Sequence, residues 1–208
     1  MVETQYKTIV DEQLKLAKGR VSSFLVPIEK LGDTQARAII GTYRVAVEPN
    51  FIPWMLQAYE TARSQKAKRA LKQNINDEIS QNHPKMLRDF AQSCGVVVSE
   101  EHYRRAAQPV LEMWSLFTRQ DNLRNIGIAA TLESTSQVFI PYLAEIGRKL
   151  RCTNFTYTDV HGEADIEHAR DLHEGLVQEM EHSATPWRTV ATAVDKTTKF
   201  LESILTIN

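Results

Sequence analysis

The segment from His161 to His168, with the sequence HGEADIEH, carries residues whose types and spacing could bind a metal. His161, Asp165 and His168 stand at positions i, i+4 and i+7. An α-helix turns by about 100° per residue, so the three side chains would project within roughly 60° of one another. Imidazole and carboxylate groups are typical ligands of iron, manganese and zinc. The spacing therefore predicts a helix that directs two imidazoles and a carboxylate toward one point.

Metal sites in helical bundles draw their ligands from facing helices, and two further segments offer such ligands. Glu78 lies near the end of one predicted helix, and His83 begins the next in Asn82-His83-Pro84. Glu133 lies on an otherwise apolar helix face, where an unpaired carboxylate is costly to bury. The combined set contains three carboxylates and three imidazoles and could hold two metal ions. Oxygen ligands mixed with imidazole favour iron or manganese over a closed structural zinc site.

The elements that must position these residues are predicted to be helices. Glycine and proline are scarce, with 8 and 7 occurrences in 208 residues, and helical periodicity is nearly continuous. Helix starts are expected near Asp33, Ser99, Asp121 and Pro186, and one long helix is expected from about Trp54 to Glu78. We therefore expect a single all-α domain over residues 1–208, arranged as a bundle of seven to eight helices.

The composition is that of an ordinary globular protein, with 42% hydrophobic and 25% charged residues. A net charge of -1 argues against a dedicated nucleic-acid binder. No run of about 18 apolar residues predicts a membrane span, and the first residues lack the apolar core of a signal peptide. A cytoplasmic location is expected. Cys94 and Cys152 lie far apart in the sequence and are expected to be two separate thiols.

Other polar residues are expected to serve the surface rather than a second site. A single ferritin-type pair, Glu179-x-x-His182, lies close to the proline that starts the last helix, and we expect both residues to be exposed. The basic run Arg63, Lys66, Lys68, Arg69 and Lys72 is interpreted as an exposed helix side rather than a nucleic-acid patch. By contrast, Tyr43 and Trp54 could line a substrate pocket.

Three segments together resemble a known family. They are NINDE with NH at 74–78 and 82–83, ES with IP at 133–134 and 140–141, and HGEADIEHAR at 161–170. With them the chain resembles the heme-oxygenase-like diiron oxidases, most closely the group of the chlamydial protein associating with death domains. The resemblance implies the helical bundle shared with the TenA and PqqC proteins. It also implies two iron ions per chain, with manganese possible, held by Glu78, His83, Glu133, His161, Asp165 and His168.

The function implied by the resemblance is that of a non-heme dinuclear-iron oxidase or oxygenase, which uses O₂ to oxidise a small organic substrate. A homodimer is also expected, because bundles of this kind often associate. Two alternatives remain open. One is a metal-free, TenA-like hydrolase, which needs a cysteine nucleophile in its pocket. The other is a non-catalytic interaction protein resembling the chlamydial one, which would take up no metal.

Overall fold

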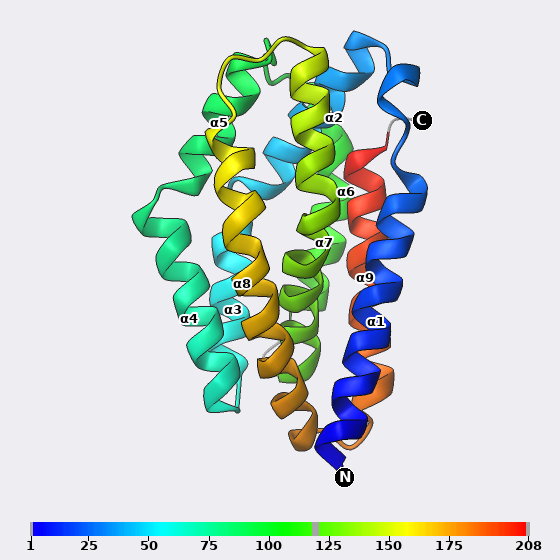
Figure 1. The fold of residues 1–208 in the computed structure, drawn as a ribbon, viewed down its shortest axis with the longest axis vertical. Helices are drawn as coiled ribbons and strands as arrows, with labels where there is room; N and C mark the ends of the chain where they lie inside the picture. The colour runs from blue at the N-terminus through cyan, green and yellow to red at the C-terminus, as the bar shows by residue number, and fades with distance from the viewer. Residues whose placement is uncertain (1, 118–120, 207–208) are drawn as a thin grey trace.

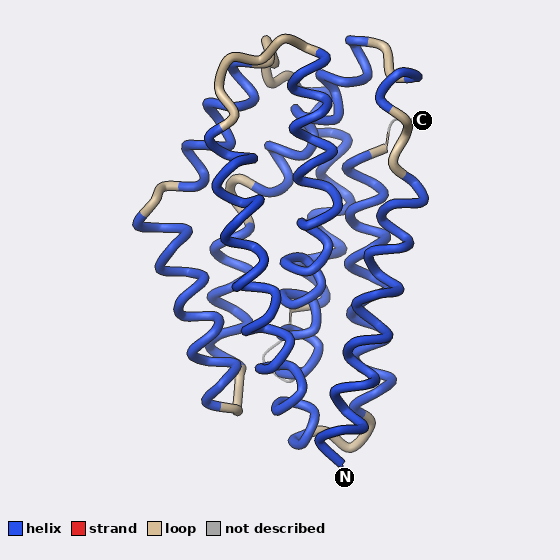
Figure 2. Tube along the Cα trace, viewed as in Figure 1, coloured by secondary structure: helices blue, strands red, loops and turns tan. Residues whose placement is uncertain are grey.

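The computed structural model describes residues 2–117 and 121–206, as helices joined by short loops (Figures 1 and 2). The helices are α1 (Val2–Phe24), α2 (Asp33–Val47), α3 (Phe51–Thr61), α4 (Gln65–Ser80), α5 (His83–Ser93), α6 (Glu100–Leu116), α7 (Asn122–Lys149), α8 (Thr156–Glu179) and α9 (Pro186–Leu205). Short 3₁₀ helices span Ile28–Lys30 and Met180–His182. No strand occurs in the residues so described. The predicted all-α bundle is therefore confirmed.

Helix α7 runs through the middle of the bundle and contacts α1, α3, α8 and α9 (Figure 1). It is buried along most of its length, from Leu123 to Gly147, because apolar or small residues occur around its whole circumference. Glu133 lies halfway along this helix, so its carboxyl group is necessarily inside the protein. In the described part of the chain, no helix is both long and apolar enough to cross a membrane.

The prediction of one continuous helix from Trp54 to Glu78 is wrong, because this segment forms two helices, α3 and α4, with a break between them. Ala62 leaves helical geometry with φ -56° and ψ 137°. Ser64 then caps α4, its side chain accepting a hydrogen bond from the Ala67 N–H at 3.1 Å. Serine is a preferred N-cap because its oxygen satisfies an amide that the first helical turn leaves free. The apolar periodicity continues through the break and so conceals it.

Glu179, at the end of α8, holds the break between α3 and α4 in place. Its carboxylate accepts hydrogen bonds from the backbone N–H groups of Arg63 at 2.9 Å and Ser64 at 2.8 Å, and from the Asn122 side chain. The expectation that Glu179 is a surface residue is therefore wrong: its exposed fraction is 0%. His182 is exposed, as expected. Three donors from two distant segments make burial of the carboxylate possible, and sequence spacing does not reveal them.

The expectation of two separate thiols is also wrong, because Cys94 and Cys152 form a disulfide. Their Cα atoms lie 4.4 Å apart although 58 positions separate them in the sequence. Cys94 follows α5, and Cys152 lies in the loop between α7 and α8. The bond therefore joins the two segments that lead away from His83 and toward His161.

Replacement of Glu179 by alanine should destabilise the fold. The change leaves three donors without their acceptor, one buried and two partly buried. Each unsatisfied buried donor costs about 1–3 kcal/mol, although such costs are not additive. We expect the free energy of unfolding, measured by urea titration, to fall by roughly 3 kcal/mol. Glu181→Ala is the matched control: Glu181 is exposed and only two residues away, so the change should stay within about 0.5 kcal/mol. Equal effects of the two substitutions would contradict this account of the break.

Candidate metal centre

The six residues predicted to bind metal lie in the bundle interior on four helices. Helix α4 carries Glu78, α5 begins at His83, and α7 carries Glu133. Helix α8 carries the remaining three. All six are buried, with exposed fractions of 8% or less. Their ligand atoms form two groups that could each hold a metal ion: Glu78, His83 and His161; and Glu133, Asp165 and His168.

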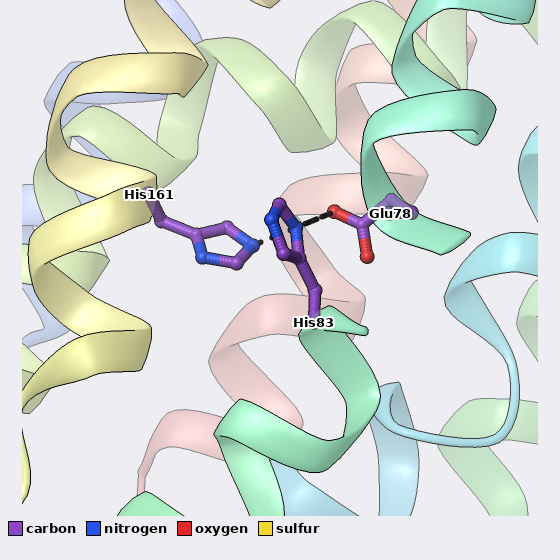
Figure 3. Close-up of side chains that lie close together, drawn as sticks. All are labelled: Glu78, His83 and His161. Carbon is purple, nitrogen blue, oxygen red and sulfur yellow. Dashed lines mark hydrogen bonds and ion pairs between the residues drawn. The ribbon is translucent and has the colours of Figure 1, made fainter. Parts of the chain in front are cut away.

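The first group joins α4, α5 and α8 around the Glu78 carboxylate (Figure 3). Glu78 Oε1 lies 2.8 Å from His83 Nδ1 and 3.5 Å from His161 Nε2. Because the carboxylate can only accept, the nearer imidazole N–H donates to it. The imidazole rings of His83 and His161 are also close, with their centroids 4.5 Å apart. One carboxylate oxygen and two imidazoles therefore face a common point.

Backbone geometry brings His83 back toward Glu78. Helix α4 ends at Ser80, and Asn82 adopts the left-handed conformation with φ 56° and ψ 48° before α5 starts. Asparagine tolerates this conformation better than most residues. Pro84 occupies the first turn of α5, where its missing N–H costs nothing. The two-helix corner is thus tight enough for residues only five positions apart to meet side by side.

The second group joins α7 and α8. His168 Nδ1 lies 3.8 Å from Glu133 Oε2, and the other oxygen of Glu133 accepts a hydrogen bond from the Asn74 side chain at 2.6 Å. His168 Nε2 faces Asp77 at 3.1 Å. An imidazole that binds a metal through one nitrogen commonly donates its other N–H to a carboxylate, which fixes the ring. Asp77 is therefore placed to orient His168, with Nδ1 directed toward Glu133.

The expectation that the α8 residues aim at one point is wrong in one respect. His161 belongs to the first group, whereas Asp165 and His168 belong to the second. An α-helix rises about 1.5 Å per residue, so seven positions separate two side chains by roughly 10 Å along the axis. Residues on one face therefore line up along the helix rather than converge. The spacing distributes the ligands over two neighbouring positions.

Burial and mutual charge set the protonation of these groups. Burial raises the pKa of Glu133 well above its usual value, and the nearby charge of Asp165 raises it further. Burial likewise raises the pKa of Asp165. Burial also opposes ionisation of Glu78, but hydrogen bonds from His161 and His83 outweigh it and lower that pKa to about 2. Burial is the largest influence on His161 and lowers its pKa, but the hydrogen bond to Glu78 and the charges of Asp165 and Glu78 together outweigh it, so the pKa is raised.

The residues present fit a metal ion. Glu133 Oε2 and Asp165 Oδ2 are buried and have no hydrogen-bond partner among the described residues. An orphaned carboxylate oxygen in the interior is costly, and a cation would satisfy it. The donors are oxygen and imidazole nitrogen, with no thiolate, which suits iron or manganese. Each group supplies three ligands, so each ion would keep positions open for other molecules.

Both groups border one pocket with largely apolar walls. Five of the six residues line it, the exception being His168. Its apolar lining includes Trp54, Leu87, Leu132, Phe139 and Ile140, and Tyr43 lines it as well. The expectation that Tyr43 and Trp54 line a pocket beside the site is therefore confirmed. Such a pocket would bind an apolar molecule directly beside the open ligand positions.

Sequence reasoning missed the residues that support the ligands. Asn74 holds Glu133 and Asp77 holds His168, while the Tyr157 carbonyl accepts from His161 Nδ1 at 2.9 Å. The hydroxyl of Tyr157 lies 2.8 Å from that of Tyr43 in the pocket wall. Helical spacing carried a usable signal, because Asn74 and Tyr157 each lie four positions before a predicted ligand on the same helix face.

Comparison with known proteins identifies the family to which this chain is similar. The sequence pattern of the family described as iron-containing redox enzyme matches residues 42–200, which include all six candidate ligands. No curated protein shows significant similarity to the chain. The match covers well over half of the sequence, and the chain therefore belongs to the family of iron-containing redox enzymes.

Proposed function

We propose that this protein is a non-heme dinuclear-iron oxidase or oxygenase that uses O₂ to oxidise a small, largely apolar substrate. The observation that carries the proposal is the pair of buried three-residue groups opening onto one pocket. Membership of an iron-containing redox family supports the choice of iron, with manganese as the alternative metal. The proposal further assigns one ion to each group. The use of two irons and O₂ is taken from the resemblance to the group of the chlamydial protein associating with death domains. A homodimer stays a prediction.

The chain's own residues would hold the metals and shape the reaction space. Imidazoles of His83, His161 and His168 and three carboxylates would bind the ions. When bound, the two ions would supply the electron-transfer chemistry that lets O₂ react with the substrate. Asn74 and Asp77 keep Glu133 and His168 oriented, so little reorganisation is needed. The apolar pocket walls bind the substrate beside the ligands and exclude bulk water.

The alternatives have less support from the residues of the pocket. A TenA-like hydrolase needs a cysteine nucleophile, but Cys94 and Cys152 are bonded to each other, and neither lines the pocket. A non-catalytic interaction protein has no need for two orphaned carboxylate oxygens in its interior, because each costs stability. Metal uptake separates that alternative from the proposal.

Replacing Asp165 with asparagine should remove one of two bound irons. The substitution keeps the side-chain shape and removes the charge that the second group offers a cation. Protein loaded anaerobically with iron(II) should contain about two irons per chain, and Asp165→Asn should contain about one, because each ion depends on its own three ligands. The measurement is elemental analysis, with circular dichroism to check the helical fold.

Glu167→Gln is the matched control for this experiment. Glu167 is exposed on the same helix, two positions from Asp165. The iron content of the Glu167→Gln variant should therefore equal that of the unchanged protein. Unchanged iron content in Asp165→Asn would show that the assignment of the second group is wrong. Absence of stoichiometric metal from the unchanged protein would contradict the proposed function as a whole and favour the interaction protein.

Metal binding near neutral pH should release protons. Glu133, Asp165 and His161 have raised pKa values, so in the metal-free protein they keep a proton to higher pH than usual. A metal must displace that proton, and its affinity should therefore fall as the pH falls. Glu78, with a pKa of about 2, is already ionised and adds no such dependence. Calorimetric titration with manganese(II) in two buffers of different ionisation enthalpy measures the release. Identical heats in both buffers would contradict the prediction.

A further inference from the structure

Helix α4 presents a basic groove to solvent on the outer side of the candidate metal centre. The groove runs between α4 and α8 and is lined by Lys66, Arg69, Lys72, Gln73, Asn76 and Asp171, together with Ala70. Figure 1 places α4 at the edge of the bundle, on the opposite side from α1 and α9. Of the basic run noted in the sequence, Arg63, Arg69 and Lys72 are exposed, as expected, whereas Lys66 and Lys68 are half-buried. Lys66, Arg69 and Lys72 form one wall of the hollow.

The positive charge of this groove is only partly balanced. Lys66 pairs with Glu174, and Asp171 pairs with Arg170, its neighbour on α8. In the part of the chain that the structure describes, no ion pair involves Arg69 or Lys72, and both are exposed. Unpaired cations beside a hollow create a local positive potential that attracts and orients acidic surfaces. The whole chain is nearly neutral, at -1, so this patch is a local feature.

A short chain of hydrogen bonds leads from the groove to the second ligand group. Gln73, which lines the groove, donates to both oxygens of Asp77 at 2.9 and 3.1 Å. Asp77, whose side chain is 24% exposed, contacts His168 Nε2 at 3.1 Å. The opposite nitrogen of that ring faces Glu133. Two hydrogen-bonded contacts therefore connect a groove residue with a candidate ligand of the buried site.

We propose that this groove docks an acidic one-electron carrier protein, and that electrons enter the metal centre through Asp77 and His168. The inference rests on the proposed function. Reduction of O₂ to water takes four electrons, and a substrate oxidised by two electrons supplies half of them. The carrier supplies the other two, one in each docking event, and is itself oxidised each time. The matching protons come from solvent and substrate.

The groove fits an acidic protein better than a nucleic acid. Asp171 lines the α8 side of the hollow and Glu174 pairs with Lys66 beside it, so a continuous phosphate backbone would meet negative charge along one wall. A folded acidic carrier can place its carboxylates against Arg69 and Lys72 alone. Binding of an oligonucleotide serves as the alternative outcome of the test below.

The test measures binding of an acidic [2Fe–2S] ferredoxin by calorimetry, to both the metal-free and the iron-loaded protein at low ionic strength. We expect binding to both forms, weakening as salt is added, because the contact is between charges. The variant carrying Arg69→Glu and Lys72→Glu should bind at least about tenfold more weakly, since attraction becomes repulsion at two contacts. Its iron content and its chemical reduction by dithionite should not change.

The matched control carries Lys196→Glu and Lys199→Glu on α9. These lysines have the same three-residue spacing and are exposed. They belong to α9, which lies on the opposite side of the bundle from α4 (Figure 1). The change in net charge is identical, so ferredoxin affinity should stay within about twofold if docking depends on the groove rather than on overall charge. Urea titration of both variants checks that each is folded.

The possible results separate the two proposals. Equal ferredoxin affinity of the two variants would overturn the docking proposal even if iron is bound. So would a ferredoxin affinity that neither added salt nor the Arg69→Glu and Lys72→Glu substitutions weaken. Tighter binding of an oligonucleotide than of ferredoxin at the groove would overturn it in favour of a nucleic-acid surface. A protein that holds no iron would contradict the proposed function by metal content alone, whatever the ferredoxin titration shows.

Discussion

Burial of three carboxyl groups inside a helical bundle is the constraint on which the rest of the candidate site depends. An unpaired buried carboxylate is strongly disfavoured, so each one needs protons, donors or a cation. Glu78 meets this need with two histidines. Glu133 receives one hydrogen bond from Asn74 and keeps its other oxygen unpartnered, as Asp165 does. Two buried carboxyl oxygens thus lack hydrogen-bond partners among the described residues, at the position where a cation would bind them.

The geometry of one helix explains why four helices are required. Ligands on α8 are spread along its axis, so neither end can assemble a site alone. Glu78 and His83 complete the upstream position because α4 and α5 meet in a tight corner at Asn82. Glu133 completes the downstream position because α7 is buried on all sides. The corner between α4 and α5 therefore positions Glu78 and His83, and the buried helix α7 positions Glu133.

The sequence revealed the helical fold and the six residues that the structure brings together, because helical periodicity and polar residues on apolar faces are local signals. It did not reveal the break at Ser64, the burial of Glu179 or the bond between Cys94 and Cys152. Each of these depends on a partner more than 50 positions away or on a cap hidden within continuous periodicity. The division of the ligands into two groups likewise needed the axial rise of α8, which an angular projection ignores.

Helix α4 connects these features, since its two ends and its outer face contribute to different parts of the molecule. Its start is fixed by Glu179, and its last turn supplies Glu78 to the interior and Asp77 to the rim. Its outer face carries Arg69 and Lys72. Because a helix is stiff along its axis, the position of Asp77 beside His168 is coupled to the anchoring at Ser64. A single rigid element therefore fixes both the buried ligands and the charged surface next to them.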